Sequence, residues 1–211
     1  SASLQPLWQS VGNPERPLLA VGGIAEDAEG NIWVVSCENN EIQIISPEGE
    51  YLETWDGTGG GGEQFKFDIN AGYADGEMTF DEEGRIFVVE PGAKRVQVFG
   101  PDRTLLASWG TFGTGEGEFA TPISIAVSGG EVFVLDMDRD DVQVFSPDGT
   151  YLRTISEHGT GPGQLFDPRY ITTDGEGNVW VADYGNNRVQ AFTSGGEPIT
   201  AWGEFGSEPG Q

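Results

Sequence analysis

Carboxylates that recur at one point of a repeated pattern are the side chains of this sequence best placed to bind a ligand. Glu90, Asp136 and Asp183 each end a hydrophobic segment and are followed by a short loop. If these loops share one face, the three carboxylates form a ring able to attract a cation or a basic peptide. Arg95 and Arg188 follow Glu90 and Asp183 by five residues, so ion pairs that close the loops are the alternative interpretation.

Alternating carboxylates in one of these loops suggest a metal. Asp136, Asp138 and Asp140 have the spacing of oxygen ligands in a calcium loop. The segment lacks the glycine at position six and the acidic residue at position twelve of an EF-hand. Calcium is therefore a weak candidate beside a hydrated acidic turn, and no other cofactor is expected.

Other catalytic chemistry has little support in the sequence. One histidine, His158, cannot form a multi-histidine metal site, and the lone Cys37 cannot form an intramolecular disulfide. No Gly-x-Ser-x-Gly elbow or phosphate-binding loop occurs. We therefore expect a protein that is not an enzyme.

The charge balance restricts the partners. Thirty-five acidic residues face ten basic ones, a formal charge of −25. Nucleic acids and anionic membrane surfaces are repelled by such a surface, because phosphate binding depends on Lys and Arg. The expected partner is a protein or peptide; solubility or adaptation to high salt is the alternative reason for the charge.

Location is predicted only indirectly. No apolar stretch approaches the ~18 residues that span a bilayer, and residues 1–20 lack a basic start followed by an apolar core. The first residue is Ser1, which suggests a cleavage or truncation site. We expect an extracellular or cell-envelope protein.

The elements that carry these residues form a fourfold repeat. Central aromatic residues spaced by 54, 46 and 47 positions mark the copies: Trp33, Phe87, Phe133 and Trp180. Turn residues divide each copy into four short strands, and the second strand is apolar at consecutive positions. Such a strand must be buried on both faces, between neighbouring sheets. The pattern predicts an all-β fold, a β-propeller of four-stranded antiparallel blades.

The repeats set the domain organisation. Residues 19–64, 73–118, 120–162 and 166–211 form the four copies of a single propeller segment, and residues 1–18 form the end of a preceding blade. The third strand of every copy has glutamine at its second position, at 43, 97, 143 and 190. These glutamines either face solvent or make hydrogen bonds between strands.

Two segments carry a family resemblance. Residues 183–192 join an Asp, an Asn pair and an Arg to a Val-Gln-Ala-Phe strand, and residues 109–119 form a Trp-Gly, Gly-rich connector that ends in Phe. They resemble the NHL repeat, and the resemblance covers nearly the whole chain. It implies a ring of about six blades. Enzymes that share this architecture include lactonases and amidating lyases.

Further contact residues are expected at the insertion and at the chain start. The longest connector, between Asp56 and Glu77, predicts a projecting loop whose Phe65, Phe67 and Tyr73 contact a partner, unless it is only a tolerated insertion. Tyr184, beside Asp183, belongs to the same set of expected partner contacts, as do Arg95 and Arg188.

The N-terminal segment matches an outer strand. Leu4, Leu7 and Trp8 fit the outer-strand pattern, so we expect an assembly strand there and a ring completed by polypeptide outside this sequence. A second copy of the chain, or another chain, would supply that polypeptide.

The sequence favours a non-catalytic binding or assembly module. Two alternatives stay open: a fragment of a propeller hydrolase or lyase, and a carbohydrate-binding propeller that uses Trp109 and Trp202.

Overall fold

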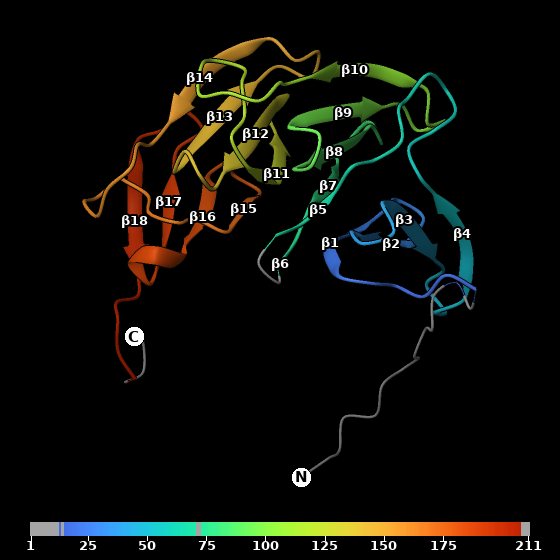
Figure 1. The fold of residues 1–211 in the computed structure, drawn as a ribbon. Helices are drawn as coiled ribbons and strands as arrows, with labels where there is room; N and C mark the ends of the chain where they lie inside the picture. The colour runs from blue at the N-terminus through green and yellow to red at the C-terminus, as the bar shows by residue number, and fades with distance from the viewer. Residues whose placement is uncertain (1–12, 14, 71–72, 208–211) are drawn as a thin grey trace.

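Four antiparallel sheets of four strands each make up the fold in the computed structural model, which describes residues 13, 15–70 and 73–207. Figure 1 shows the sheets following one another along an arc. The predicted all-β propeller architecture is confirmed. Within the described residues, helix is limited to the 3₁₀ turn η1 (Tyr184–Asn186), and no helix is long and apolar enough to cross a membrane.

Each sheet is one blade, with its strands in sequence order. Blade 1 comprises β1 (Val21–Glu26), β2 (Ile32–Ser36), β3 (Glu41–Ile45) and β4 (Tyr51–Trp55); blade 2 comprises β7 (Glu77–Phe80), β8 (Ile86–Glu90), β9 (Arg95–Phe99) and β10 (Leu105–Trp109). Blade 3 comprises β11 (Pro122–Ser128), β12 (Glu131–Asp136), β13 (Asp141–Phe145) and β14 (Tyr151–Ile155); blade 4 comprises β15 (Tyr170–Thr173), β16 (Val179–Asp183), β17 (Arg188–Phe192) and β18 (Pro198–Trp202).

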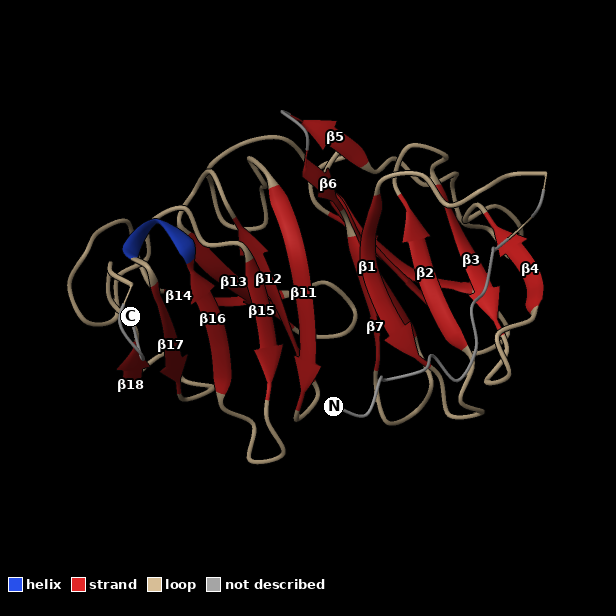
Figure 2. Ribbon diagram, turned by 90° about the horizontal axis from the view of Figure 1, so that it is seen from below, coloured by secondary structure: helices blue, strands red, loops and turns tan. Residues whose placement is uncertain are grey.

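The first strand of each blade lies on the inside of the arc. β7 and β11 contact each other, and β1 and β15 contact them from either side. Figure 2 shows these inner strands toward the middle, with β4 and β18 at the two ends. The inner strands therefore line the axis of the arc.

In blades 1, 2 and 4, one aspartate fixes the turn between the first and second strands. In blade 4, Asp174 accepts hydrogen bonds from the backbone of Asn178 and from the indole Nε1 of Trp180, both at 2.9 Å. Blade 1 repeats this arrangement with Asp27 and Trp33. These hydrogen bonds, led by that from Trp180, lower the pKa of Asp174 to about 2. The repeated Asp and Trp are thus one structural unit.

Apolar side chains fill the three interfaces between blades. β8 is buried at all five positions, as expected for a strand packed between two sheets. The first interface also contains Phe65 and Phe67 of the inserted connector, and Phe65 lies 5.0 Å from Trp55 between ring centroids. The expected projecting loop with exposed Phe65 and Phe67 is therefore wrong, because both rings bury their area in the core.

The rest of the insertion forms a small hairpin, β5 (Asp68–Asn70) and β6 (Tyr73–Asp75). Tyr73 lies in β6, and its side chain lies outside what the structure describes. Leu4, Leu7 and Trp8 lie outside the described residues as well. Their expected contacts stay predictions.

Candidate functional site

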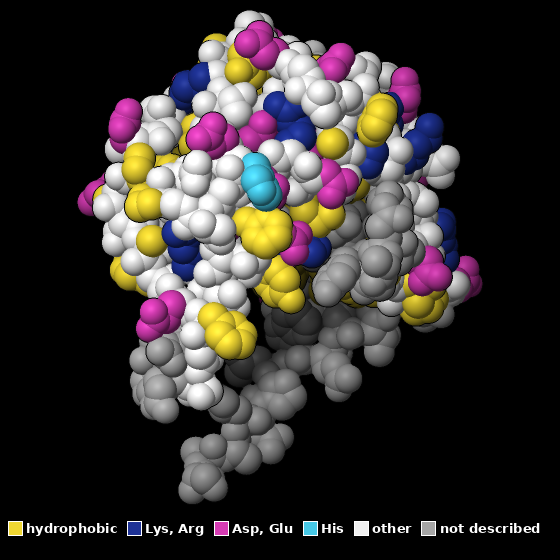
Figure 3. All heavy atoms as spheres, turned by 60° about the vertical axis from the view of Figure 1, so that its left-hand side comes forward, with side chains coloured by type: hydrophobic (Ala, Val, Ile, Leu, Met, Phe, Trp, Pro, Cys, Tyr) yellow, Lys and Arg dark blue, Asp and Glu magenta, His cyan; other side chains and the backbone are white. Residues whose placement is uncertain are grey.

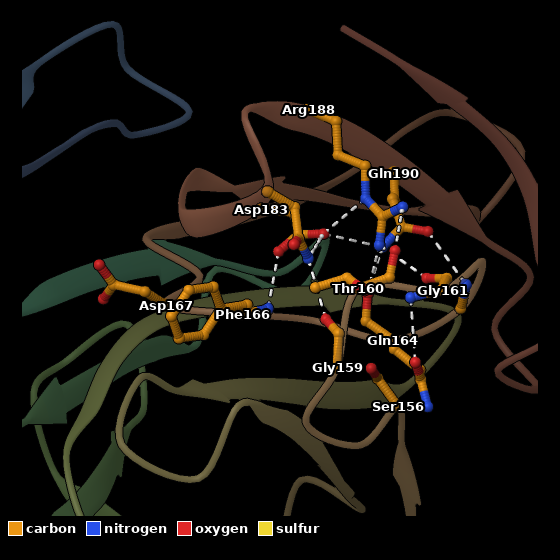
Figure 4. A network of polar contacts seen from close by, with 12 residues as sticks. Ser156, Gly159, Thr160, Gly161, Gln164, Phe166, Asp167, Asp183, Arg188 and Gln190 are labelled. Atoms are coloured by element: carbon orange, nitrogen blue, oxygen red, sulfur yellow. Dashed lines mark hydrogen bonds and ion pairs between the residues drawn. The ribbon is translucent and has the colours of Figure 1, made fainter. Parts of the chain in front are cut away.

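The loop between the second and third strands of blade 4 is held by one buried carboxylate (Figure 4). Asp183 Oδ1 accepts a hydrogen bond of 2.8 Å from the backbone N–H of Phe166. Its Oδ2 accepts from Arg188 Nε at 2.7 Å and from the amide of Gln190 at 3.0 Å. Arg188 also donates to the carbonyl of Gln164 in the incoming connector. The network ties the connector between blades 3 and 4 to the fourth sheet.

Blade 2 has the same arrangement. Glu90 accepts hydrogen bonds of 2.8 Å from Lys66 N, Arg95 Nε and Gln97 Nε2. Blade 3 differs, since Asp136 accepts from the backbone N–H groups of Ala120 and Thr121, and Arg139 pairs with Asp141 instead. Burial raises the pKa values of Asp136 and Asp141.

Burial corrects the expectation of an exposed acidic ring. The side chains of Glu90, Asp136 and Asp183 have no exposed surface. The alternative interpretation is confirmed, because Arg95 pairs with Glu90 at 2.8 Å and Arg188 pairs with Asp183 at 2.7 Å. Partner binding through these residues stays a prediction. In the structure, the three carboxylates hold the connectors against the blades by hydrogen bonds.

The four glutamines share this task. Each is buried and bonds the backbone of an incoming segment; Gln143, for example, accepts from Gly117 N at 2.8 Å and donates to Glu118 O at 2.7 Å. Gln190 does the same with Gly163 and Gln164. Solvation is therefore the wrong explanation. All four glutamines bond the incoming segment, and those of blades 1, 2 and 4 also bond a loop acid.

The expected calcium ligands do not converge. Asp138 accepts from the Thr121 hydroxyl at 2.6 Å, and Asp140 accepts from the backbone of Asp167 and contacts His158 Nδ1, both at 2.6 Å. Asp136 faces the two backbone donors named above. In the part of the chain that the structure describes, no three His, Cys, Asp or Glu side chains could hold a metal ion. The calcium assignment to Asp136, Asp138 and Asp140 is thus corrected.

Near these loops and connectors, the exposed side chains are aromatic and polar. Tyr184 is exposed, and the guanidinium of Arg169 lies 5.3 Å from its ring centroid. His158 contacts Phe166 edge to face at 5.5 Å. Figure 3 shows the histidine, in cyan, on the surface beside hydrophobic side chains.

A second cluster, which sequence reasoning missed, lies on the inner strands. Glu77 pairs with Val89, Ser124 with Leu135 and Tyr170 with Ala182, so the three occupy one level of β7, β11 and β15. Gly23 of β1 lies against Glu77, where a Cβ would meet Glu77 Cα at 2.8 Å. One feature of the sequence could have revealed this cluster. Glu77 is a charged residue at the start of an inner strand, where the other copies have Gly, Ser or Tyr.

Hydrogen bonds join the cluster across three blades. The Ser124 hydroxyl and the Ile125 N–H, the latter at 3.0 Å, donate to Glu77 Oε2, and Ser124 Oγ accepts from Ile171 N at 3.0 Å. Tyr170 lies at the same level on β15 and lines the same groove as Glu77. Burial raises the pKa of Glu77 despite these bonds, and burial next to Glu77 raises the pKa of Tyr170 to about 12.

The outer edge of blade 4 presents an apolar surface. Trp202 is 59% exposed, and its ring stacks on Trp180 of the same blade with centroids 4.8 Å apart. Ile199 and Phe205 are exposed nearby in sequence. Trp109, at the same register position in blade 2, packs instead on Phe145 at 5.5 Å.

Comparisons with known proteins agree with the fold. Residues 111–200 match a family described as a 6-bladed β-propeller, DUF5128. No curated protein matches this chain. The fold and this match define a β-propeller.

Solved structures of propeller enzymes are similar in fold. A streptogramin B lyase aligns with a TM-score of 0.66 at 15% identity, over 92% of this chain and 58% of that one. A catalytically inactive virginiamycin B lyase from Staphylococcus aureus aligns with a TM-score of 0.65 at 16% identity, over 92% of this chain and 59% of that one. A gluconolactonase from Xanthomonas campestris aligns with a TM-score of 0.62 at 16% identity, over 87% of this chain and 63% of that one. The chain thus spans less than two thirds of each.

Proposed function

We propose that this chain is a non-catalytic binding and assembly module, four NHL-like blades whose fourth-blade edge binds another blade of the same repeat type. One observation carries the proposal: Trp202 is 59% exposed, whereas Trp55 at the same register position is 5% exposed. Both residues end the outer strand of their blade.

The covering contact has a constant geometry. The fourth residue of the turn between the third and fourth strands of each following blade lies on the last residue of the preceding outer strand. Arg103 covers Trp55, with its guanidinium 5.3 Å from the ring centroid. Gly149 lies so close to Trp109 that a Cβ would meet the indole at 2.6 Å, and Gly196 lies against Ile155 in the same way.

Trp202 has no such cover from a following blade among the described residues. Exposed aromatic surface on a propeller edge favours association, since burying a large apolar side chain contributes about 1.5–3 kcal/mol. The partner that fits is a blade with a small residue or an arginine at the covering turn position. A second copy of this chain carries such turns.

Sedimentation velocity over a concentration series tests this. We expect reversible association of the native chain that Trp202→Ser weakens. Phe112→Ser is the matched control, because Phe112 is an exposed aromatic residue of a connector and not of the blade edge. A native chain that stays monomeric, or association that both variants weaken equally, contradicts the proposal.

A basic protein or peptide is the second candidate partner, and the ion pairs favour it. All eight arginines pair with carboxylates inside the chain, so the excess negative charge at the surface is left without compensation. Binding of an oligolysine peptide should weaken steeply with salt. Salt-independent binding would contradict this electrostatic proposal. The same surface predicts no useful affinity for an oligonucleotide at physiological salt.

The enzyme and carbohydrate alternatives have less support. The lyase and lactonase likeness is at 15–16% identity and concerns the fold. Most of the loop carboxylates that the sequence suggested as a site bond connectors or arginines. Trp109 packs between blades and is not part of an open sugar platform.

A further inference from the structure

The two end blades of the arc differ in burial. The outward face of blade 4 is open, with Val189 38% exposed and Trp202 59% exposed. The front face of blade 1 carries Val34 and Ile45, which are only 5% and 3% exposed. Among the described residues, no strand precedes β1. The burial of this front face therefore needs a covering segment that comes before β1 in the chain.

The segment that enters blade 1 bonds its second strand in the same register as the three connectors. In blades 2 to 4, the residue whose backbone N–H donates to the acid that ends the second strand follows the preceding outer strand by eleven positions: Lys66 after Trp55, Ala120 after Trp109 and Phe166 after Ile155. In blade 1, Leu19 donates to the Ser36 hydroxyl at 3.0 Å. Trp8 stands eleven positions before Leu19.

The glutamine contacts agree with this register. Gln97 donates to the carbonyl of Glu63, eight positions after Trp55, and the corresponding carbonyls in blades 3 and 4 stand nine positions after the outer strand. Gln43 donates to the carbonyl of Arg16, eight positions after Trp8. Trp8 thus has the place of the last residue of an outer strand that precedes blade 1.

Gly49 is the residue of blade 1 that would cover such a strand. It is the fourth residue of the turn between β3 and β4, the position from which Gly149 covers Trp109. The φ angles of the two glycines are 89° and 88°. Gly49 follows Trp8 by 41 positions, and Gly149 follows Trp109 by 40. Because it has no side chain, Gly49 leaves room for an indole ring.

We propose that residues 4–8 dock on the front face of blade 1 as an outer strand, with the indole of Trp8 on Gly49. The partner of this surface is then a segment of the chain itself. Docked there, Trp8 takes the place that Trp202 of a second copy needs, so the segment limits head-to-tail association. This limiting role rests on the proposed function, whereas the docking of Trp8 does not.

Hydroxyl-radical footprinting of the monomer tests the docking. At a protein concentration too low for association, Trp8 should be oxidised about as slowly as Trp55 and several times more slowly than Trp202. Gly49→Ala places a Cβ against the indole and should raise the oxidation of Trp8 severalfold, while that of Trp55 stays constant.

Gly177→Ala is the matched control, because Gly177 has a similar φ of 82° in a turn where a Cβ would meet only Ser128 Oγ, at 3.6 Å. It should leave the oxidation of Trp8 unchanged. Trp8 that is oxidised as fast as Trp202 in the native chain, or equally in both glycine variants, overturns the proposal. If Gly49→Ala fails to fold, the comparison within the native chain decides.

Sedimentation velocity tests the effect on association. Trp8→Ser frees Gly49 and should tighten association severalfold, and the double variant with Trp202→Ser should lose that gain. Association that Trp8→Ser weakens or leaves unchanged overturns the limiting role. If the native chain and Trp8→Ser both stay monomeric while Trp8 is protected from oxidation, the proposed function fails and the docking of Trp8 stands.

Discussion

The amide nitrogen of Gln97 lies 2.8 Å from Glu90 Oε1, and neither side chain has exposed surface. The same amide group accepts from Glu63 N at 3.1 Å and donates to Glu63 O at 3.0 Å. Gln97 thereby joins the loop acid of blade 2 to the connector that enters the blade. The acid and the glutamine together hold the connector against the blade. Asp183 and Gln190 form the same arrangement in blade 4.

Removing this acid should destabilise the fold. Glu90→Ala leaves Lys66 N and Gln97 without their acceptor. Arg95 keeps its ion pair with Glu63, so we expect a loss at the low end for a broken buried pair, about 3 kcal/mol. Urea unfolding measures the free energy, with the exposed Glu82→Ala as control. Equal stability of the two variants would show that Glu90 does not fasten the connector.

The fold could be predicted from the sequence because each blade repeats its own signals. Asp174, Gly177 and Trp180 mark a turn and the second strand of a blade at fixed spacing, and four copies in register reveal the architecture. Phe65 and Phe67 were misjudged because a glycine run before them indicates a loop tip, whereas long-range contacts with Trp55 draw the segment into the core.

The sites were less predictable, for two physical reasons. Whether Glu90 and Asp183 face solvent depends on connectors that arrive from the preceding blade, which spacing along the chain does not reveal. The cluster around Glu77 depends on three strands brought to one level, so its members are 47 and 46 residues apart in sequence.

A methyl group at Gly23 should disturb the inner strands. The added Cβ would lie 2.8 Å from Glu77 Cα and 2.9 Å from its Cγ, so β1 or β7 must shift. We expect Gly23→Ala to cost about 1–3 kcal/mol of unfolding free energy. Gly175→Ala is the control, because no atom lies within 4 Å of its Cβ position. Thermal unfolding that is equal in both variants would contradict the close packing of β1 on Glu77.

Glu77 should make stability depend on pH in a defined direction. Burial raises its pKa above the ordinary value of 4.5, so the folded chain holds this proton more tightly than the unfolded chain. Its contribution to stability is fully present below pH 4.5 and is lost as the pH rises through the folded pKa.

Unfolding of the native chain and of Glu77→Gln in urea at several pH values measures this effect. The stability of the native chain relative to the variant should fall as the pH rises. Glu26 and Tyr170 face the same groove and are present in both proteins, and the pKa of Tyr170, about 12, keeps it neutral in this range. A difference that does not change with pH would contradict the raised pKa.

The accessibility of Trp202 tests the proposed blade edge most directly. Hydroxyl-radical footprinting at increasing protein concentration should show falling oxidation of Trp202, while oxidation of Phe112, which is 77% exposed, stays constant. Trp202→Ser should remove the concentration dependence of oxidation at the neighbouring Phe205. Oxidation of Trp202 that is independent of concentration, in a range where the chain associates, would contradict binding through this edge.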